Sequence, residues 1–282
     1  MTGHLPARES AGKSAPFLSR HVFKTSRLAE FCSRKELVNQ TGHAAEDWPL
    51  VILKELVDNA LDGAEEARIA PVIEITVSQD KIAVADNGPG VTPDTVANIL
   101  DFASRTSSRE AYSSPTRGAQ GNAISTILAM PFALDGGRGE TTIESRGVAH
   151  RITFSIDPIR QEPRIARVCE TSDVTIGTKF TVRWPDLAGT ILDDARLRFL
   201  QVAENFTWAN PHLTLAVRWD RSSAADYLTA AATNPGWMKW RPSDPTSAHW
   251  YDEARLGRLM AAHIAHAEDH GQVCPTSAAQ AA

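Results

Sequence analysis

Four β-strand patterns follow one another between Glu140 and Arg183, and no helical pattern separates them. Parallel strands need long crossover connections, usually helices, whereas consecutive strands joined by short turns pair in an antiparallel way. Helical patterns lie before and after this run and do not alternate with single strands. The order of the elements therefore predicts an α+β fold built on a mixed, mostly antiparallel sheet.

A long amphipathic helix is predicted from Glu46 to Arg68. Its apolar residues recur every three or four positions, and the pattern stops before Pro71, because proline disfavours a helical conformation in the residue that precedes it. The other predicted elements are strands over 72–77, 81–85 and 213–219, and helices starting at Pro93 and near Gln120 and spanning 191–208 and about 251–267.

With 282 residues, the chain has room for one large domain and a small appendage. We expect a disordered leader over 1–20, a globular domain over 21–221, a Trp- and Pro-rich helical appendage over 222–270 and a disordered tail over 271–282. Three tryptophans of the appendage, Trp237, Trp240 and Trp250, either pack onto the domain or form a partner-binding surface.

Composition limits the kinds of protein that fit this sequence. The formal net charge is -5, so no overall basic character of the kind that dominates nucleic-acid binding is present. No apolar run approaches the roughly 18 residues that a membrane span needs, and we expect a cytoplasmic protein with no membrane association. The three cysteines, Cys32, Cys169 and Cys274, lie far apart, so neither a disulfide framework nor a zinc site is predicted.

Three polar residues share one face of the first long helix. Glu55, Asn59 and Asp62 stand at positions i, i+4 and i+7, which places them within about 60° of one another around the helix axis. Two carboxylates and an amide on one face can position a water molecule and hold a hard cation through oxygen ligands. Taken alone the pattern is weak, because solvated polar helix faces are common.

A second motif, Asp86-Asn87-Gly88-Pro89-Gly90, closes the strand predicted over 81–85. The aspartate can accept a hydrogen bond from an exocyclic amine, and Gly88 and Gly90 permit a tight turn that brings the backbone close to a flat ligand. Motifs of this type also occur in ordinary turns.

Two further motifs complete the set. A glycine-bearing segment, Gly118 to Ser125, joins a long polar loop (103–118) to a helix. Free N–H groups at a helix N-terminus and the helix dipole both favour phosphate there. Gly177-Thr178 then precedes the last strand of the 140–183 run, where the threonine hydroxyl can assist base recognition.

In this order and spacing the four motifs resemble the nucleotide-binding boxes of the GHKL superfamily, which includes gyrase, MutL, histidine kinases and heat-shock chaperones. Within it, ELVDNALDGAEEARIAP (55–71), Ser107-Ser108, RGAQGNAIS (117–125) and ANPH (209–212) look most like the topoisomerase VI B subunit, over roughly residues 22–215. The resemblance implies the Bergerat ATP-binding fold, a two-layer sandwich with helices on one face of the sheet, for the domain at 21–221.

The resemblance also implies roles for individual residues. Glu55 would be the general base that polarises the attacking water, Asn59 would bind magnesium, and Asp86 would accept from the adenine amine. The residues expected to bind ATP and Mg²⁺ are Asn59, Asp62, Asp86, Gly88, Gly90, Ser107, Ser108, Gly118, Ala119, Gln120, Gly121, Asn122, Ala123, Ile124, Ser125 and Thr178.

Two departures from the family pattern are expected to matter. Ala123 stands where the family usually has glycine, which narrows backbone freedom in the segment that would wrap the triphosphate. We also expect the chain to lack the second domain from which the family supplies a lysine to the terminal phosphate. In that family the DNA-cleaving tyrosine belongs to a different subunit, so free-standing topoisomerase activity is not expected.

The function predicted from the sequence is therefore a slow, magnesium-dependent ATP-hydrolysing switch. It would couple to a protein partner in a DNA transaction, and it could form a nucleotide-dependent homodimer. Two alternatives stay open: a kinase- or chaperone-like module that does not act on DNA, and a nucleotide-binding domain without turnover.

Overall fold

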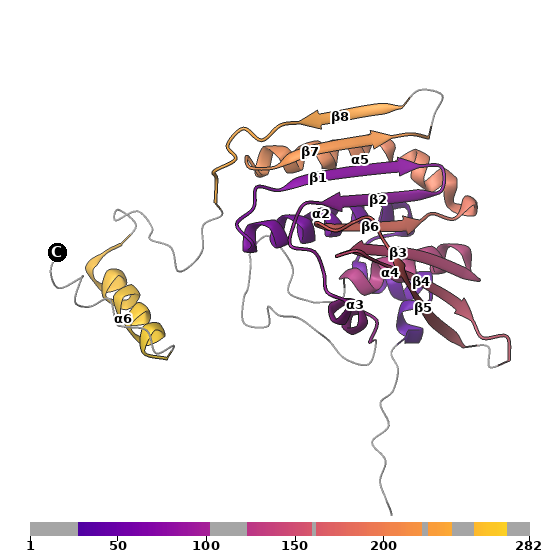
Figure 1. The fold of residues 1–282 in the computed structure, drawn as a ribbon, viewed down its shortest axis with the longest axis horizontal. Helices are drawn as coiled ribbons and strands as arrows, with labels where there is room; N and C mark the ends of the chain where they lie inside the picture. Colours follow the sequence, from indigo (N-terminus) through magenta and orange to yellow (C-terminus); the bar gives the residue numbers. More distant parts are fainter. Residues whose placement is uncertain (1–27, 102–122, 160–161, 222–224, 239–250, 270–282) are drawn as a thin grey trace, which may run out of the picture.

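The computed structural model describes residues 28–101, 123–159, 162–221, 225–238 and 251–269. One eight-stranded sheet organises the chain, in the order β5-β4-β3-β6-β2-β1-β7-β8 (Figure 1). Its strands are β1 (Val72–Ser78), β2 (Lys81–Asp86), β3 (Arg138–Ser145), β4 (Val148–Ile156), β5 (Pro163–Thr171), β6 (Thr178–Arg183), β7 (Thr214–Trp219) and β8 (Asp226–Ala230). The α-helices are α1 (Arg34–Thr41), α2 (Trp48–Glu66), α3 (Pro93–Ile99), α4 (Ala123–Asp135), α5 (Gly189–Ala209) and α6 (Glu253–Asp269).

The sheet is mixed, as predicted. Strands β1 and β7 pair in parallel, with Val72 opposite Thr214, and the other pairs of neighbours are antiparallel. The parallel pair follows from the chain path, because α5 carries the chain back along the sheet before β7 begins. The α+β class predicted from the order of the elements is therefore confirmed.

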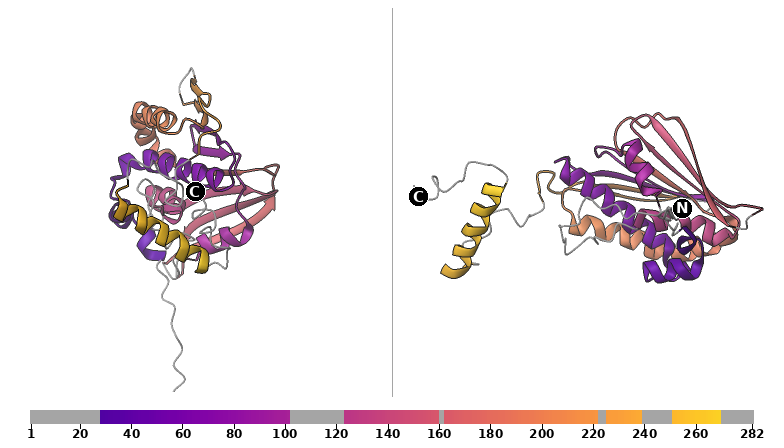
Figure 2. Two further views of the ribbon diagram at one scale, coloured as in Figure 1. Left: turned by 90° about the vertical axis from the view of Figure 1, so that its left-hand side faces the viewer. Right: turned by 90° about the horizontal axis from the view of Figure 1, so that it is seen from below.

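Helices α2, α4 and α5 lie together on one side of the sheet (Figure 2). The strands show why this side is covered, because buried and exposed residues alternate along them. In β1, Ile73, Ile75 and Val77 are at most 1% exposed, whereas Glu74 between them faces solvent. Period-two alternation of this kind gives a sheet one apolar and one polar face, and the two-layer arrangement is confirmed.

Helix α2 lies at the centre of the helical layer. Its apolar stripe is fully buried, including Leu53, Val57 and Leu61, and it contacts α5, α4 and β2. Proline in the first turn suits the start of the helix. The boundaries predicted from the sequence, 46–68, exceed the observed ones by two residues at each end, which is the usual scatter for helix termini.

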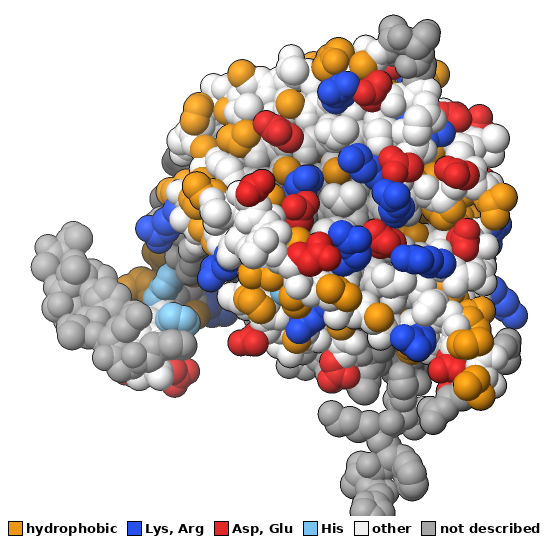
Figure 3. All heavy atoms as spheres, turned by 45° about the vertical axis from the view of Figure 1, so that its right-hand side comes forward, with side chains coloured by type: hydrophobic (Ala, Val, Ile, Leu, Met, Phe, Trp, Pro, Cys, Tyr) orange, Lys and Arg blue, Asp and Glu red, His pale blue; other side chains and the backbone are white. Residues whose placement is uncertain are grey.

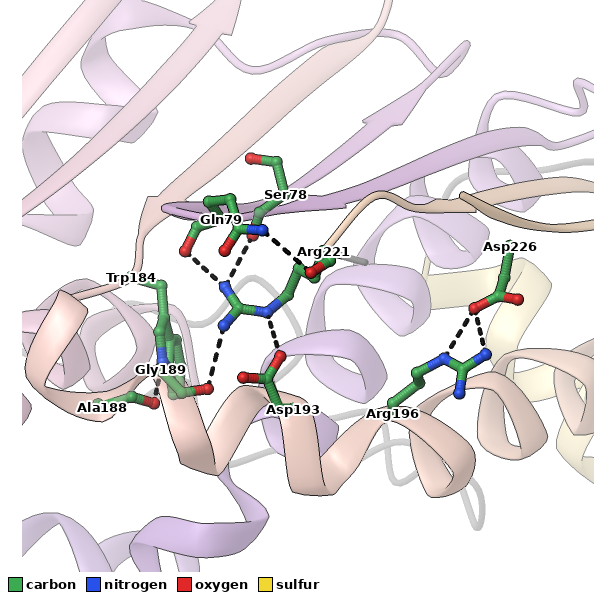
Figure 4. A network of polar contacts seen from close by, with 9 residues as sticks. All are labelled: Ser78, Gln79, Trp184, Ala188, Gly189, Asp193, Arg196, Arg221 and Asp226. Carbon is green, nitrogen blue, oxygen red and sulfur yellow. Dashed lines mark hydrogen bonds and ion pairs between the residues drawn. The ribbon is translucent and has the colours of Figure 1, made fainter. Parts of the chain in front are cut away.

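Strand β8 was not predicted from the sequence. It begins at Asp226, after the domain boundary expected at residue 221, and it belongs to the same sheet as the other strands. The pairing of β8 with β7 is antiparallel, with Leu228 opposite Val217. The side chains of Arg196 and Asp226 form a two-bond ion pair that connects α5 to β8 (Figure 4).

Beside this pair, Arg221 connects three parts of the chain (Figure 4). Its guanidinium donates to the carbonyls of Ser78, Gln79 and Gly189 and to the Asp193 carboxylate, 2.7 Å away. The Arg221 side chain is 5% exposed, and a buried guanidinium is tolerated when its donors are satisfied in this way. The hydrogen bond from Arg221 is the main cause that lowers the pKa of Asp193.

Basic and acidic side chains on the sheet strands and their connections form ion pairs with one another. Lys179 lies 3.2 Å from Glu144, and Arg183 lies 3.0 Å from Asp80. Figure 3 shows acidic and basic side chains interspersed over the face it presents, with no continuous basic area among the described residues there. In the part of the chain that the structure describes, no helix has the length and apolar character needed to span a bilayer.

Candidate nucleotide-binding site

Asp86 is the last residue of β2, and its carboxylate joins two strands. Oδ1 accepts the backbone N–H of Gly88 at 2.8 Å and that of Thr178 at 3.2 Å. Thr178 begins β6, the antiparallel neighbour of β2. Both bonds use the same oxygen, which leaves Oδ2 to accept from a ligand amine.

Burial raises the pKa of Asp86 above its usual value of 3.8, although the hydrogen bonds from Gly88 and Thr178 act in the opposite direction. An ionised carboxylate that has lost part of its hydration gains more than an exposed one from a new hydrogen-bond donor. A partly buried carboxylate with a raised pKa is a candidate functional group on physical grounds.

Glycine is required around Asp86 for steric reasons. A Cβ on Gly177, which has φ +72°, would lie 1.7 Å from the Asp86 carbonyl oxygen. A Cβ on Gly90, which has φ +73°, would lie 2.5 Å from the hydroxyl of Ser145. Gly88 is buried, and a Cβ there would lie 3.0 Å from Asp86 Oδ1 and, at an ordinary contact distance, 3.7 Å from the backbone nitrogen of Ala64. The turn after β2 therefore packs directly against α2.

Side chains of the turn and its surroundings hold it in place. We call residues 86–91 the base turn. The Asn87 amide accepts from the backbone nitrogen of Val72 at 2.8 Å and donates to the carbonyl of Ala70 at 3.0 Å. Arg146, in the connection between β3 and β4, donates to the carbonyl of Pro89 at 3.1 Å. The base turn is thus tied to the chain before β1 and to the β3–β4 connection.

Glu55 and Asn59 lie on α2, which precedes the base turn in the sequence. The Glu55 side chain is 29% exposed and forms an ion pair with Lys54 at 2.9 Å. Asn59 is exposed, and its Nδ2 donates to the carbonyl of Glu55 at 2.6 Å. Because the amide nitrogen faces the helix backbone, the Asn59 amide oxygen faces away from it.

Lys54 also contacts Asp58, at 3.0 Å. Burial alone would lower the pKa of Lys54, but the hydrogen bonds to Glu55 and Asp58 outweigh it and raise the pKa. The Lys54 ammonium thus joins two carboxylates that stand three positions apart on the helix. Like charges at that spacing repel one another, so Lys54 compensates the two negative charges.

Asp62, the third residue of the predicted polar face, is only 9% exposed. It is followed by Gly63, where a Cβ would lie 3.8 Å from Pro89 of the base turn. Asp62 therefore lies where α2 meets the base turn, whereas Glu55 and Asn59 lie toward solvent.

The predicted triphosphate segment is described only at its end. Ala123, Ile124 and Ser125 are the first three residues of α4, and the Ser125 hydroxyl donates to the carbonyl of Ile99 at the end of α3 at 3.3 Å. The remaining predicted residues of this part of the site, Ser107, Ser108, Gly118, Ala119, Gln120, Gly121 and Asn122, lie outside the described residues.

Sequence reasoning missed the residues that support the base turn. Asn87 lies inside the recognised motif, but nothing in the sequence shows that its amide bonds to the chain before β1. Ser145 and Arg146 lie 55 or more residues beyond Gly90 in the sequence, and only the pairing of β3 with β6 brings Ser145 opposite Thr178. The sequence places Lys54 next to Glu55 but does not show that its ammonium group contacts both Glu55 and Asp58.

Comparison with known sequences places this site in a family. Residues 44–188 match the family described as "Histidine kinase-, DNA gyrase B-, and HSP90-like ATPase". The matched region covers about half of the chain and includes α2, the base turn and Thr178. The chain therefore belongs to this ATPase family, as its resemblance to the GHKL superfamily predicted.

Within the family, the chain is similar to proteins named as the B subunit of type 2 DNA topoisomerase 6. The protein from Natronomonas pharaonis is 35% identical over 148 residues, which is 49% of this chain and 18% of the relative. The protein from Archaeoglobus fulgidus is 30% identical over 174 residues, 58% of this chain and 28% of the relative. The chain thus spans less than a third of these relatives.

A solved structure of the N-terminal domain of a DNA repair protein is 17% identical, with a TM-score of 0.36, and the match covers 64% of this chain and 51% of that protein's chain. That likeness is too low to add to the assignment.

Proposed function

We propose that this chain binds ATP between the base turn and α2 and hydrolyses it slowly with magnesium, as a switch that couples to a protein partner. The observation that carries the proposal is the Asp86 carboxylate, which is partly buried, has Oδ1 occupied by two backbone N–H groups and keeps Oδ2 for a ligand donor. The exocyclic amine of adenine is such a donor, whereas guanine presents a carbonyl at the same place.

Glu55 is the general base of the proposed reaction. Its carboxylate is accessible to solvent and can accept a proton from the water that attacks the terminal phosphate, a role for which it must be ionised. Asn59, one turn further along α2, lies on the same side of the helix.

Magnesium fits the chemistry of these residues. Mg²⁺ commonly takes one or two protein ligands and completes its shell with substrate phosphates and water. The Asn59 amide oxygen provides one hard ligand of that kind. Among the described residues, no group of three or more His, Cys, Asp and Glu side chains could hold a metal alone, which is compatible with an ion bound largely by the nucleotide. Mg²⁺ would neutralise charge on the phosphates.

A protein partner is the second half of the proposal. The named relatives are subunits of a DNA topoisomerase, which supports a role beside another protein in a DNA transaction. We expect slow turnover by the chain alone, because a cation against the terminal phosphate stabilises charge that develops in the transition state. A partner that contributes such a cation would accelerate hydrolysis. Nucleotide-dependent dimerisation and a cytoplasmic location also stay predictions.

The test is nucleotide binding followed by turnover. Titration of the purified chain with ATP and with GTP, each with Mg²⁺, should show saturable binding of ATP and much weaker binding of GTP. Phosphate release should be slow and should rise when a candidate partner encoded beside this chain is added. No binding of ATP would contradict the whole proposal. Binding without any phosphate release, with or without the partner, would leave a nucleotide-binding domain that has no turnover.

A further inference from the structure

Ser145 is a buried residue at the end of β3, and no motif of the sequence includes it. Its side chain is 2% exposed. The hydroxyl oxygen accepts the backbone N–H of Val91 at 3.0 Å and donates its own hydrogen to the carbonyl of Gly177 at 2.7 Å. One hydroxyl therefore connects the end of the base turn to the residue that precedes Thr178.

The two segments that Ser145 joins are the two that bond to Asp86. Gly88 lies within the base turn, and Thr178 follows Gly177 directly, and both donate their N–H groups to Asp86 Oδ1. The separation between these segments decides whether one oxygen can accept both bonds. It also decides where the other oxygen, Oδ2, lies relative to a ligand.

The surroundings leave little room for the turn to find another position. A Cβ on Gly90 would lie 2.5 Å from Ser145 Oγ and 2.9 Å from the carbonyl oxygen of Gly177. The base turn, Ser145 and Gly177 are therefore in close contact. Loss of the hydroxyl would leave a partly buried N–H at Val91 and a buried carbonyl at Gly177 without this bond, which a buried backbone group tolerates poorly.

We infer that Ser145 is a positioning residue for base recognition: its hydroxyl fixes the two backbone donors of Asp86 so that Oδ2 meets the amine of adenine. The inference rests on the proposed function, because it assumes that Asp86 binds adenine. Ser145 itself need not touch the nucleotide. It acts through Asp86, and its effect should appear only with ligands that carry the amine.

A ligand that lacks one group separates this role from a general effect on folding. Purine riboside triphosphate equals ATP without the exocyclic amine, so wild-type protein should bind it about tenfold or more weakly than ATP. In Ser145→Ala, ATP affinity should fall about tenfold, affinity for purine riboside triphosphate should change less than twofold, and the preference for the amine should largely disappear. Coupling between a residue and a ligand group is measured by this double comparison.

Two further variants control for packing. Ser145→Cys keeps nearly the same volume but has a much weaker hydrogen-bonding group, so it should lose the preference for the amine as Ser145→Ala does. If Ser145→Ala does not fold, Ser145→Cys provides the test in its place. Ser172→Ala removes a hydroxyl that accepts from the backbone nitrogen of Val174 at 3.1 Å and donates to Glu144 at 3.0 Å, neither of which belongs to the base turn. It should retain the wild-type preference for the amine.

The outcomes distinguish this inference from the proposed function. If wild type binds ATP and Asp86→Asn does not, but Ser145→Ala and Ser145→Cys keep the full preference for the amine, Ser145 has no positioning role. The same conclusion follows if both ligands weaken equally in the variants, because that result indicates general destabilisation. If wild type shows no preference for the amine at all, the adenine assignment of Asp86 fails first.

Discussion

The two sides of the candidate site are built differently. The base turn is tied through Asn87 to the start of β1, and through Ser145 and Arg146 to the end of β3, and it packs on α2. On the other side, Glu55 and Asn59 lie toward solvent, and their described contacts are with residues of α2 itself. In the proposed function, the groups that would bind the base are therefore fixed by this chain's own contacts, whereas hydrolysis would need further groups beside α2. This difference between the two sides is compatible with the proposed switch, which binds a nucleotide and needs a partner for fast hydrolysis.

The largest effect is expected on the base side, from Asp86→Asn. The amide oxygen can still accept from Gly88 and Thr178, but the amide nitrogen would face the adenine amine as a second donor, so ATP binding should be lost. Calorimetric titration measures this directly. An Asp86→Asn protein that binds ATP with wild-type affinity would show that the base turn does not recognise adenine.

The same variant carries a pH signature in folding stability. Because the pKa of Asp86 is raised in the folded state, the folded protein binds this proton more tightly than the unfolded chain does. Its contribution is fully present below the usual value of 3.8 and is lost as pH rises through the folded pKa. The asparagine in the Asp86→Asn variant does not ionise, so the variant does not lose this stability. The Tm of the variant minus the Tm of wild type should therefore increase from acid to neutral pH. A constant difference in Tm would contradict the effect of burial.

On the catalytic side, Glu55→Gln should bind ATP normally and hydrolyse it about 10²–10⁴ times more slowly, because the amide keeps the shape and cannot accept the proton. Single-turnover phosphate release after a binding measurement separates the two steps. Equal turnover in wild type and variant would remove Glu55 from the mechanism. A loss of magnesium-dependent binding would instead assign it to support of the metal.

A smaller effect is expected from Lys54→Met, which removes the charge between Glu55 and Asp58. Lys54 is about half exposed, and exposed ion pairs contribute little because water screens them. The turnover rate should therefore fall only a few-fold with unchanged ATP affinity, and Lys54→Arg should restore it. Weaker ATP binding in Lys54→Met would indicate that the lysine contacts the phosphates.

The smallest effect on the site should come from Arg221, which lies away from both sides of it. Arg221→Met leaves the carbonyls of Ser78, Gln79 and Gly189 without their donor, which should cost about 1–3 kcal/mol of stability. The Arg221–Asp193 ion pair loses its contribution to stability as pH falls through the lowered pKa of Asp193. The difference in Tm between wild type and Arg221→Met should therefore become smaller in acid. ATP affinity measured well below Tm should not change.

The sequence predicted the parts of the fold that depend on local pattern. Helix α2, a strand over 81–85 closed by Asp86 and a strand preceded by Gly177-Thr178 were predicted from periodicity and glycine placement, and the structure includes Asp86 and Thr178 in these strands. The sequence did not predict β8, because its five residues are too few for a clear alternation. It also missed Ser145, whose importance depends on strand pairing between β3 and β6. Pairing of that kind is decided by packing of the whole sheet, which no local pattern records.

The single parallel pair of the sheet has a consequence for the order in which the chain can fold. Strand β1 begins at Val72, and its partner β7 begins at Thr214, so the ribosome must complete most of the chain before that edge of β1 is covered. The hydrogen bonds described above for the base turn involve no residue beyond Thr178, so they can form earlier. Until β7 arrives, β1 presents unpaired N–H and C=O groups that attract other strands. Protection against aggregation during synthesis therefore depends on the return of the chain through α5.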